Sequence, residues 1–207
     1  MNWRRIGSLI GSFQSISAIA YGETRTAIGA WWNPASASGR WVAQSSHGWL
    51  VAAAATRAQI SEVVSSNQYG GVTTESAFKV SENLLTAHKA PDGGLTVQGI
   101  FCPNESTAFG MLRALEDDGF AGKVHFVGFD SSPKMTDAMA KGHMDATVVQ
   151  DPIRMGYLAV KAMADHLAGR LVDKRIDTGA TLITRATMGT PEAQALLNPD
   201  FKKWLKE

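Results

Sequence analysis

The chain has 207 residues, of which 44% are hydrophobic and 19% are charged, and its formal net charge at pH 7 is +1. This composition is typical of one or two globular domains and excludes disordered and collagen-like chains. The small net charge gives no support for nucleic acid or an anionic membrane as a partner, and no apolar run approaches the roughly 20 residues of a membrane-spanning helix.

Cysteine and histidine usage gives no sign of a metal or cofactor site. The single cysteine, Cys102, cannot form an internal disulfide, so it does not report the redox compartment. No CxxC pair or histidine-rich spacing typical of zinc is present. A cysteine within a strand is more often a small buried apolar residue than a nucleophile. We therefore predict neither a metal nor a cofactor.

Residues 1–60 differ in composition from the rest of the chain. They hold five of the six tryptophans and five arginines, but no lysine, no aspartate and a single glutamate, Glu23. Because this segment lacks a sustained helix or strand period, we expect it to be poorly specified as structure. Two interpretations stay open. The first is a shifted reading frame or misplaced start joined to a genuine domain. The second is a secretory signal, since Arg4 and Arg5 precede a weakly apolar stretch that ends in "AIA".

From residue 61 onward, short β-rich runs alternate with amphipathic helical patterns. The first helix has a capping residue at Thr73 or Thr74, and the second ends at Gly119. The expected strands cover 61–69, 96–102, 123–130 and 145–151, and the expected helices cover 73–88, 105–119, 132–142 and 153–167. Such alternation requires crossovers that return to the same end of the sheet. We therefore predict an α/β fold, a parallel sheet flanked by helices on both faces.

Polar side chains follow the expected strands at the points where the strands end. Asn104 follows "GIFCP", Asp130 follows "HFVGF" and Gln150 follows "DATVV". Tyr69 follows the first of these strands. Ligands of open sheets bind outside the carboxyl ends of the strands, so we expect these side chains to meet at one edge. Simpler alternatives are helix caps for Asn104, with Glu105 in the first turn, and for Asp130, and a strand exit for Gln150.

Several sequence motifs, taken together and in order, resemble the periplasmic sugar-binding proteins of ABC importers, of the ribose-binding type. The similarity covers residues 62–199 and is carried by "NQYGGVT", "CPNESTAFGMLRAL", "VGFDSSPKM", "DATVVQDPIRMGYLAVKA" and "IDTGATLITRATM". The resemblance implies a protein of two lobes that closes on one monosaccharide, a pentose or hexose, and then docks on a membrane permease. It also implies a periplasmic location, although the start of this chain is not a convincing secretory signal.

The resemblance assigns ligand contacts to the residues that follow the strands. Asn104 corresponds to the family's amide after a strand, Asp130 to the carboxylate of the "GFD" motif, and Gln150 to the amide at the hinge between lobes. Phe129 lies in the same motif and is expected to line the cleft, and Tyr69 is expected to replace an aromatic residue that the family places nearby. These types suit a polyol, because a carboxylate accepts from two hydroxyls and an amide both donates and accepts.

The resemblance also implies parts that are missing from the expected order. The family's first lobe should precede residue 60, and the initial strand and an arginine-bearing helix of the second lobe are not found. We therefore divide the chain into an atypical segment 1–60, a second-lobe sugar-binding domain 61–151, and a hinge-crossing helix with the C-terminal tail, 152–207. Such a truncated protein is expected to bind sugar weakly, because closure between two lobes buries the ligand.

Apolar residues recur at helical spacing over 153–167. The stripe consists of Met155, Leu158, Ala159, Ala162, Met163 and Leu167. In the family this helix packs on the first lobe. Without that lobe, we expect the stripe to be exposed or to pack on residues 1–60, and to favour low stability or self-association.

The alternative function is a sugar-sensing regulatory domain of the lactose-repressor type that lacks its DNA-binding part. Because the sequence has no nucleophile elbow, paired acid and base or metal cluster, we predict that the protein is not an enzyme. The glycines of "YGGVTT" precede a helix start but match neither common phosphate-binding pattern.

Overall fold

The computed structural model describes residues 40–44 and 62–202 of the chain, and for 40–44 and 62–67 it describes the backbone alone. The strands are β1 (Arg40–Gln44), β2 (Glu62–Gln68), β3 (Gly99–Phe101), β4 (His125–Phe129), β5 (Ala146–Val149) and β6 (Thr181–Thr184). The helices are α3 (Thr74–Ala87), α4 (Glu105–Asp117), α5 (Pro133–Lys141), α6 (Pro152–Leu167) and α7 (Pro191–Leu197).

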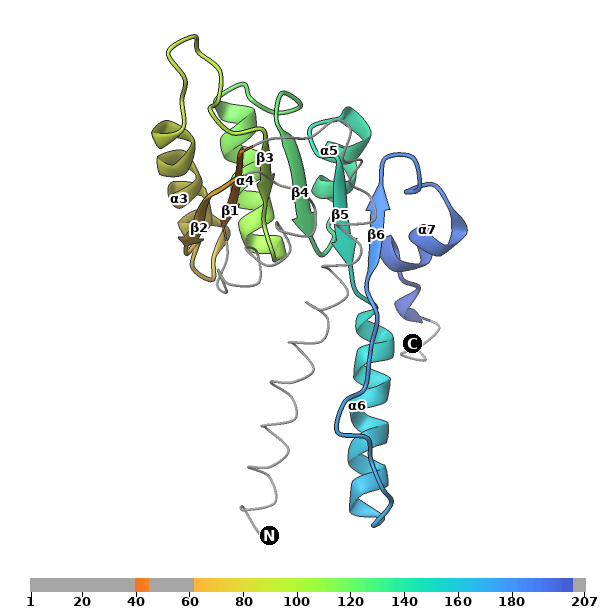
Figure 1. The fold of residues 1–207 in the computed structure, drawn as a ribbon. Helices are drawn as coiled ribbons and strands as arrows, with labels where there is room; N and C mark the ends of the chain where they lie inside the picture. The colour runs from red at the N-terminus through yellow and green to blue at the C-terminus, as the bar shows by residue number, and fades with distance from the viewer. Residues whose placement is uncertain (1–39, 45–61, 203–207) are drawn as a thin grey trace.

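One sheet organises these elements, with the strand order β2-β1-β3-β4-β5-β6 (Figure 1). The strands from β2 to β5 pair in parallel, so the predicted α/β fold with a parallel sheet is confirmed. The last strand, β6, pairs with β5 antiparallel. The chain segment after α6 therefore returns to this same sheet, a pairing that the sequence analysis did not anticipate.

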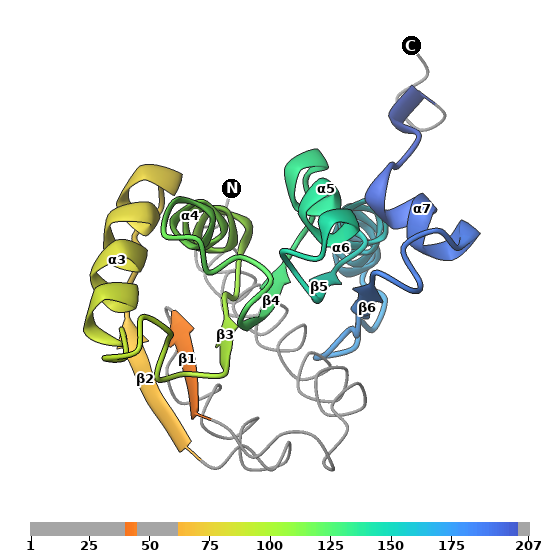
Figure 2. The ribbon, with the colours of Figure 1, turned by 90° about the horizontal axis from the view of Figure 1, so that it is seen from above.

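The helices α3, α4 and α5 all lie on one face of the sheet (Figure 2). The three crossovers from β2 to β3, β3 to β4 and β4 to β5 all step in the same direction along the sheet. Because such crossovers are right-handed, steps in one direction put their helices on one face. The expectation of helices on both faces therefore does not hold for α3, α4 and α5. The connection from β1 to β2 steps the other way, and it lies outside the described residues.

A strand inside the first 60 residues corrects a second expectation. The initial strand of the lobe was expected to be missing, but β1 lies between β2 and β3 and pairs with both. A central parallel strand of five residues is held by backbone hydrogen bonds on both sides, and these do not depend on the segment's unusual composition. The rest of the expected atypical segment, 1–39 and 45–60, lies outside the described residues.

The core fills the space between the sheet and the helices that cover it. Its fully buried large side chains include Ile100, Met111, Leu115, Phe126 and Met135. Helix α3 packs closely on α4, because α4 has a glycine at the crossing. A Cβ atom on Gly110 would lie 2.6 Å from the backbone nitrogen of Phe78. The pairing of these two helices therefore requires a residue without a side chain at position 110.

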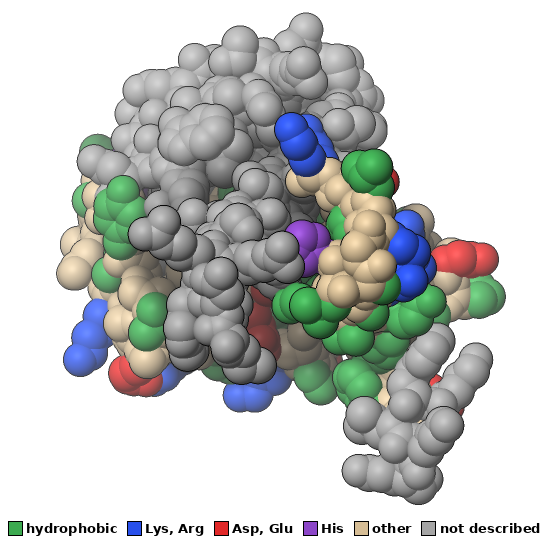
Figure 3. Space-filling model, turned by 90° about the horizontal axis from the view of Figure 1, so that it is seen from below, with side chains coloured by type: hydrophobic (Ala, Val, Ile, Leu, Met, Phe, Trp, Pro, Cys, Tyr) green, Lys and Arg blue, Asp and Glu red, His purple; other side chains and the backbone are tan. Residues whose placement is uncertain are grey.

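Helix α6 extends away from the sheet at the edge where β5 ends (Figure 1). Figure 3 views the molecule from below, the side toward which α6 extends, and hydrophobic side chains are visible on this side. No residue of α6 is buried, and Tyr157, Val160 and Leu167 are 64%, 71% and 78% exposed. Within the part of the chain that the structure describes, no helix combines the length and apolar character needed to cross a membrane.

The predicted apolar stripe of this helix is only partly exposed. Met163 and Leu167 are exposed, as expected, whereas Met155 and Leu158 are half-buried. The exposed apolar face of α6, which we call the α6 face, consists of Tyr157, Val160, Met163 and Leu167. It is therefore rotated relative to the stripe that the sequence indicated.

Candidate functional site

Three polar residues follow adjacent parallel strands at the same level of the sheet. Phe101 of β3 pairs with Val127 of β4, and Asn104 and Asp130 each come three residues later. Phe129 of β4 pairs with Val148 of β5, which brings Gln150 to within one residue of the same level. Neighbouring strands are about 4.8 Å apart, so the three positions span about 10 Å, the size of a monosaccharide. We call this edge, with Asn104, Asp130 and Gln150, the polar rim.

Asn104 both caps a helix and lies on the polar rim. Its Oδ1 accepts hydrogen bonds from the backbone N–H of Thr107 at 2.9 Å and from the Thr107 hydroxyl at 3.0 Å. The capping interpretation is therefore confirmed. Among the described residues, the side-chain Nδ2 of Asn104 makes no hydrogen bond, so this donor stays available to a ligand.

Asp130 has an unusual backbone conformation that directs its carboxyl group. Its φ is 66°, and no other non-glycine residue in the described ranges has a positive φ. Its N–H donates to the carbonyl of Val148 at 2.8 Å, and the Thr147 hydroxyl donates to its carbonyl at 2.6 Å. Helix α5 is capped by Ser132, not by Asp130. The capping alternative for Asp130 is therefore wrong.

The carboxyl group of Asp130 lies at the amino end of α4. Burial raises the pKa of this carboxyl group above its ordinary value, and the charge of Glu105 raises it further. A hydrogen bond from the backbone N–H of Glu105 acts in the opposite direction. Asp130 and the start of α4 are therefore neighbours. The sequence analysis treated Glu105 as a helix-start residue and missed this relation, since only the fold brings the two carboxylates together.

Gln150 lies where the chain leaves the sheet. It is half-buried and directly precedes Asp151, whose Oδ1 accepts from the N–H of Arg154 at 2.9 Å and caps α6. The return segment reaches the sheet beside it, since Val149 pairs with Thr181. The two chain crossings therefore lie side by side, and Gln150 belongs to the first of them.

Thr178 belongs to the second crossing and was missed by sequence reasoning. It is 4% exposed, and its hydroxyl has no hydrogen-bond partner among the described residues. A buried hydroxyl without a partner is unusual and costs free energy. A single threonine before a strand carries no sequence signal that would reveal this.

The two aromatic residues of the predicted site are placed differently from the rim. Phe129 is 4% exposed and is the last residue of β4, directly before Asp130. Tyr69 is 63% exposed and follows β2, which is separated from β3 by β1. At about 4.8 Å per strand, Tyr69 is about 10 Å from the nearest rim position. Tyr69 is therefore as many strands from Asn104 as Asn104 is from Gln150, and it lies beside the polar rim on the β2 side and not within it.

Cys102 belongs to the hydrophobic core of the lobe. Cys102 is fully buried, and burial raises the pKa of its thiol, while a hydrogen bond with Thr107 lowers it. This environment suits an inert core residue and not a nucleophile. Within the described ranges, no group of three or more histidine, cysteine or acidic residues could hold a metal ion.

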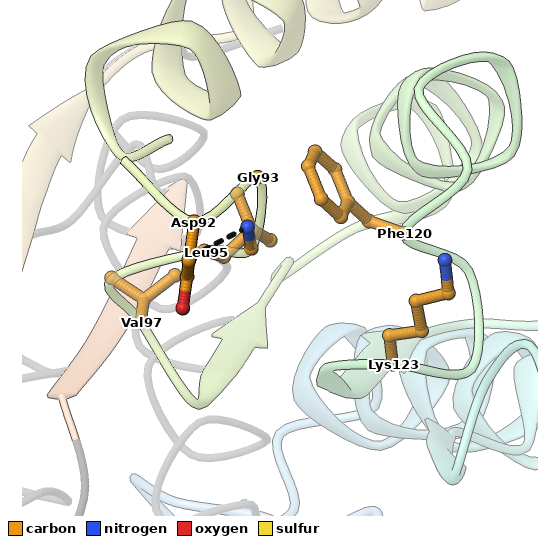
Figure 4. A pocket seen from close by; sticks show the side chains of 7 residues that line it. Asp92, Gly93, Leu95, Val97, Phe120 and Lys123 are labelled. Atoms are coloured by element: carbon orange, nitrogen blue, oxygen red, sulfur yellow. Dashed lines mark hydrogen bonds between the residues drawn. The ribbon is translucent and has the colours of Figure 1, made fainter. Parts of the chain in front are cut away.

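A pocket of about 340 Å³ lies at the amino ends of the strands, the opposite end from the polar rim (Figure 4). It is lined by Asp92, Gly93, Gly94, Leu95, Val97, Phe120 and Lys123. Val97 precedes β3 and Lys123 precedes β4, so the pocket opens at the amino ends of these strands. It is therefore separate from the polar rim.

Known proteins with similar sequences and structures share this architecture. The sequence profile described as a periplasmic binding protein domain matches residues 43–171, more than half of the chain. The ribose import binding protein of Salmonella typhimurium is 36% identical over 108 residues, which are 52% of this chain and 34% of that protein. The D-allose-binding periplasmic protein of Escherichia coli is 36% identical over 89 residues, 43% of this chain and 27% of that protein.

A solved structure gives the same result for the fold. An ABC transporter solute-binding protein from Agrobacterium vitis with bound D-fucose has a TM-score of 0.72 and 26% identity. The match covers 86% of this chain and 62% of that one. The chain spans about a third of the length of the curated relatives it matches. The family match, which begins within β1 and includes every strand to β5, shows that the chain belongs to the periplasmic binding protein domain family.

Proposed function

We propose that this chain is the second-lobe part of a solute-binding protein of an ABC importer and contributes Asn104, Asp130 and Gln150 to a monosaccharide site. The observation that carries the proposal is the polar rim, where three hydrogen-bonding side chains follow adjacent parallel strands at one level. The names of the matched proteins, which refer to ribose, D-allose and D-fucose, support a pentose or hexose as the ligand.

The rim residues divide the recognition of a sugar between them. The carboxylate of Asp130 accepts hydrogen bonds from two neighbouring hydroxyls, and the Nδ2 of Asn104 donates to a third oxygen. The side-chain amide of Gln150 both donates and accepts hydrogen bonds, from the side of the hinge between the lobes. Phe129 is buried directly before Asp130 and supports the rim by packing and not by contact with the ligand. Tyr69 contributes only if the ligand extends toward β2. Binding needs no catalytic group, so the proposed role is transport and not catalysis.

The proposed site is half of a cleft. The lobe consists of β1 and residues 61–151, and 152–207 supply the crossing helix α6 and the segment that returns to β6. A second lobe closes on the sugar in two-lobed binders and excludes water. We therefore expect this lobe by itself to bind a monosaccharide in the millimolar range and not tightly.

The proposed partners follow from the same architecture. A complete protein of this kind acts in the periplasm and delivers its sugar to an ABC permease. For the polypeptide itself, the α6 face is a surface for self-association, because it exposes large apolar side chains side by side on one helix.

Nuclear magnetic resonance tests the proposal at the rim. Backbone amide shifts are followed while D-ribose, D-allose or D-fucose is added to the labelled protein at millimolar concentrations. We expect shifts that saturate at Asn104, Asp130 and Gln150. Asn104→Ser keeps a helix-capping oxygen but removes the amide donor, so it should weaken binding without unfolding α4. Asn198→Ser, at an exposed position near the end of α7, is the matched control. The absence of any saturable shift at the rim would contradict the proposal.

A further inference from the structure

Thr147 is a polar residue within an otherwise apolar strand. Strand β5 has the sequence ATVV, and all four of its residues are buried. Valine has the same branched shape as threonine and also favours strands, so neither packing nor strand formation requires a hydroxyl at this position. A buried hydroxyl costs free energy unless it forms a hydrogen bond. The bond that the Thr147 hydroxyl forms therefore explains what a threonine contributes here.

The hydroxyl of Thr147 joins β5 to the residue that follows β4. It donates to the backbone carbonyl of Asp130 at 2.6 Å, and the two residues are 17 positions apart in the sequence. The N–H of Asp130 in turn donates to the carbonyl of Val148 at 2.8 Å. Both backbone polar groups of Asp130 are therefore bonded to successive residues of β5.

These two bonds hold a backbone conformation that an aspartate does not favour. The φ of Asp130 is 66°, and the left-handed conformation is higher in free energy than the extended one for a residue with a Cβ atom. Without the bond from Thr147, the carbonyl of Asp130 is released and the backbone can relax toward a negative φ. Because the direction of a side chain depends on the backbone dihedrals of its own residue, the carboxyl group then points elsewhere.

Thr107 has a similar relation to the neighbouring rim residue. It is 3% exposed, and its hydroxyl oxygen lies 3.1 Å from the carbonyl oxygen and 3.0 Å from the Oδ1 of Asn104. Asn104 and Asp130 are thus each bonded to the hydroxyl of a buried threonine. Ser81 also has a buried hydroxyl, but it donates at 2.7 Å to the carbonyl of Ala77 within α3 and not to the rim.

We infer that Thr147 is a positioning residue of the sugar site, whose hydroxyl fixes the direction of the Asp130 carboxylate and so raises the affinity for a monosaccharide. This inference rests on the proposed function. Thr147 is fully buried, so it acts through Asp130 and not by contact with the sugar. Strand β5 then places two of the three rim residues: Asp130 through these hydrogen bonds and Gln150 through the chain that continues from the strand.

Substitutions at position 147 test the inference by amide-shift titration with D-ribose. Thr147→Val keeps the shape but removes the hydroxyl, and we expect it to weaken D-ribose binding about threefold to tenfold, the equivalent of one hydrogen bond. Thr147→Ala also lacks the hydroxyl and should weaken binding at least as much. Thr147→Ser restores the hydroxyl, so its affinity should stay within about twofold of the wild type.

A control variant and a spectroscopic signature separate positioning from a general loss of stability. Ser81→Ala removes a buried hydroxyl from α3 and should leave D-ribose binding unchanged. The Cα and Hα chemical shifts of residue 130 in the free protein depend on its φ. They should change in Thr147→Val and Thr147→Ala, but not in Thr147→Ser or Ser81→Ala.

The possible results distinguish this inference from the proposed function. If Thr147→Val binds D-ribose as tightly as the wild type does, the inference is wrong while the proposed sugar site stands. Equal weakening by Thr147→Val and Thr147→Ser would also overturn it, because the hydroxyl is then not the cause. Equal weakening by Thr147→Val and Ser81→Ala would overturn it in favour of a general loss of stability. If the wild type shows no saturable rim shift with D-ribose, D-allose or D-fucose, the proposed function itself is contradicted, and the inference fails with it.

Discussion

Asp130 combines a left-handed backbone with a partly buried carboxyl group beside a second carboxylate. Each property alone is uncommon for a structural residue, and residues held in such conformations concentrate at functional sites. Hydrogen bonds from Asp130 to Val148 and from Thr147 to Asp130 hold the conformation. The residue is thus positioned by β5 and not by the helix that follows it.

The charge of Asp130 predicts a pH-dependent stability. Because its pKa is raised in the folded protein, folding binds its proton, and its contribution to stability is largest below the ordinary value of 3.8 and is lost as pH rises through the raised pKa. Asp130→Asn has no ionisable carboxyl group at this position, so its stability does not decrease as the pH rises through this range. We expect the variant to be more stable than the wild type at pH 7 and no more stable at about pH 3, measured by urea unfolding.

Two further variants control this experiment. Asp130→Ala also removes the charge, but alanine tolerates a left-handed backbone less well than asparagine, so it should be about 1 kcal/mol less stable than Asp130→Asn. Asp173→Asn, which makes the same substitution at an exposed position, is the matched control for the loss of one carboxyl group. A stability difference between Asp130→Asn and the wild type that is independent of pH would contradict the assignment.

Thr178 gives a second prediction at this scale. Its buried hydroxyl has no hydrogen-bond partner in the part of the chain that the structure describes, so replacing it with a methyl group of similar shape removes a desolvated polar group. Thr178→Val should raise the free energy of unfolding by about 1 kcal/mol, as measured by urea unfolding. Thr187→Val is the control, because the Thr187 hydroxyl accepts from the N–H of Thr184 at 3.0 Å and its loss should destabilise. A destabilised Thr178→Val would show that the hydroxyl has a partner in solution.

The sequence allowed candidate site residues to be chosen, but not their individual conformations to be predicted. Asn104, Asp130 and Gln150 were selected because each follows an apolar run, a pattern that is local. The positive φ of Asp130 and the closeness of Glu105 depend on contacts between different strands and helices. Local patterns carry no information on such contacts, so these features could not be predicted.

Among the elements, the pair α3 and α4 shows how one glycine sets a helix crossing. A side chain on Gly110 would lie 2.6 Å from the backbone nitrogen of Phe78 and 2.8 Å from the carbonyl carbon of Ala77. Backbone atoms of a helix cannot move away as a flexible side chain does. The close approach of α3 and α4 therefore depends on this position, and Arg113 above the Phe78 ring at 4.1 Å adds to the same interface.

Two glycine-to-alanine variants separate helix propensity from packing. Gly110→Ala should destabilise the protein by about 1 to 3 kcal/mol, because it overpacks the crossing and the helices must separate. Gly156 lies on α6, and apart from the neighbouring backbone of its own helix no described atom lies within 4 Å of the new methyl group, so Gly156→Ala should stabilise the protein by about 0.5 to 1 kcal/mol. Thermal unfolding measures both. A stabilised Gly110→Ala would mean that α3 and α4 are farther apart than in this structure.

Most elements could be predicted, because their signals are short-range. Thr73 caps α3 through a reciprocal arrangement with Ser76, and the predicted helix starts there within one residue. β1 was missed, since a five-residue strand between two others owes its stability to its neighbours. The placement of α3, α4 and α5 on one face was also missed, because it depends on strand order and not on periodicity.

At the scale of the whole molecule, α6 differs from the other described helices, because each of them has buried residues and α6 has none. It extends from the sheet at the edge of the polar rim, with no buried residue (Figure 1). Large exposed apolar patches on soluble proteins mark interaction surfaces. We therefore expect the α6 face to pack against another surface, either a second lobe or a second copy.

Self-association through the α6 face is the expected behaviour of the isolated polypeptide. Burial of each exposed large apolar side chain contributes about 1.5 to 3 kcal/mol, so burial of Tyr157, Val160 and Leu167 in both copies offsets the cost of association and favours a dimer. Sedimentation velocity across a concentration series should show a mass that increases with concentration. The double variant Val160→Glu, Leu167→Lys adds no net charge and should weaken association at least tenfold.

A matched double variant distinguishes this face from general stickiness. Val72→Glu, Phe201→Lys makes the same types of change at two exposed apolar residues away from α6, which are 91% and 53% exposed. It should associate as the wild type does, because these residues are isolated and a single exposed apolar side chain is normal on a protein surface. If both double variants weaken association equally, overall hydrophobicity and not the α6 face causes the association. If the wild type is monomeric at all concentrations, the α6 face does not bind a second copy.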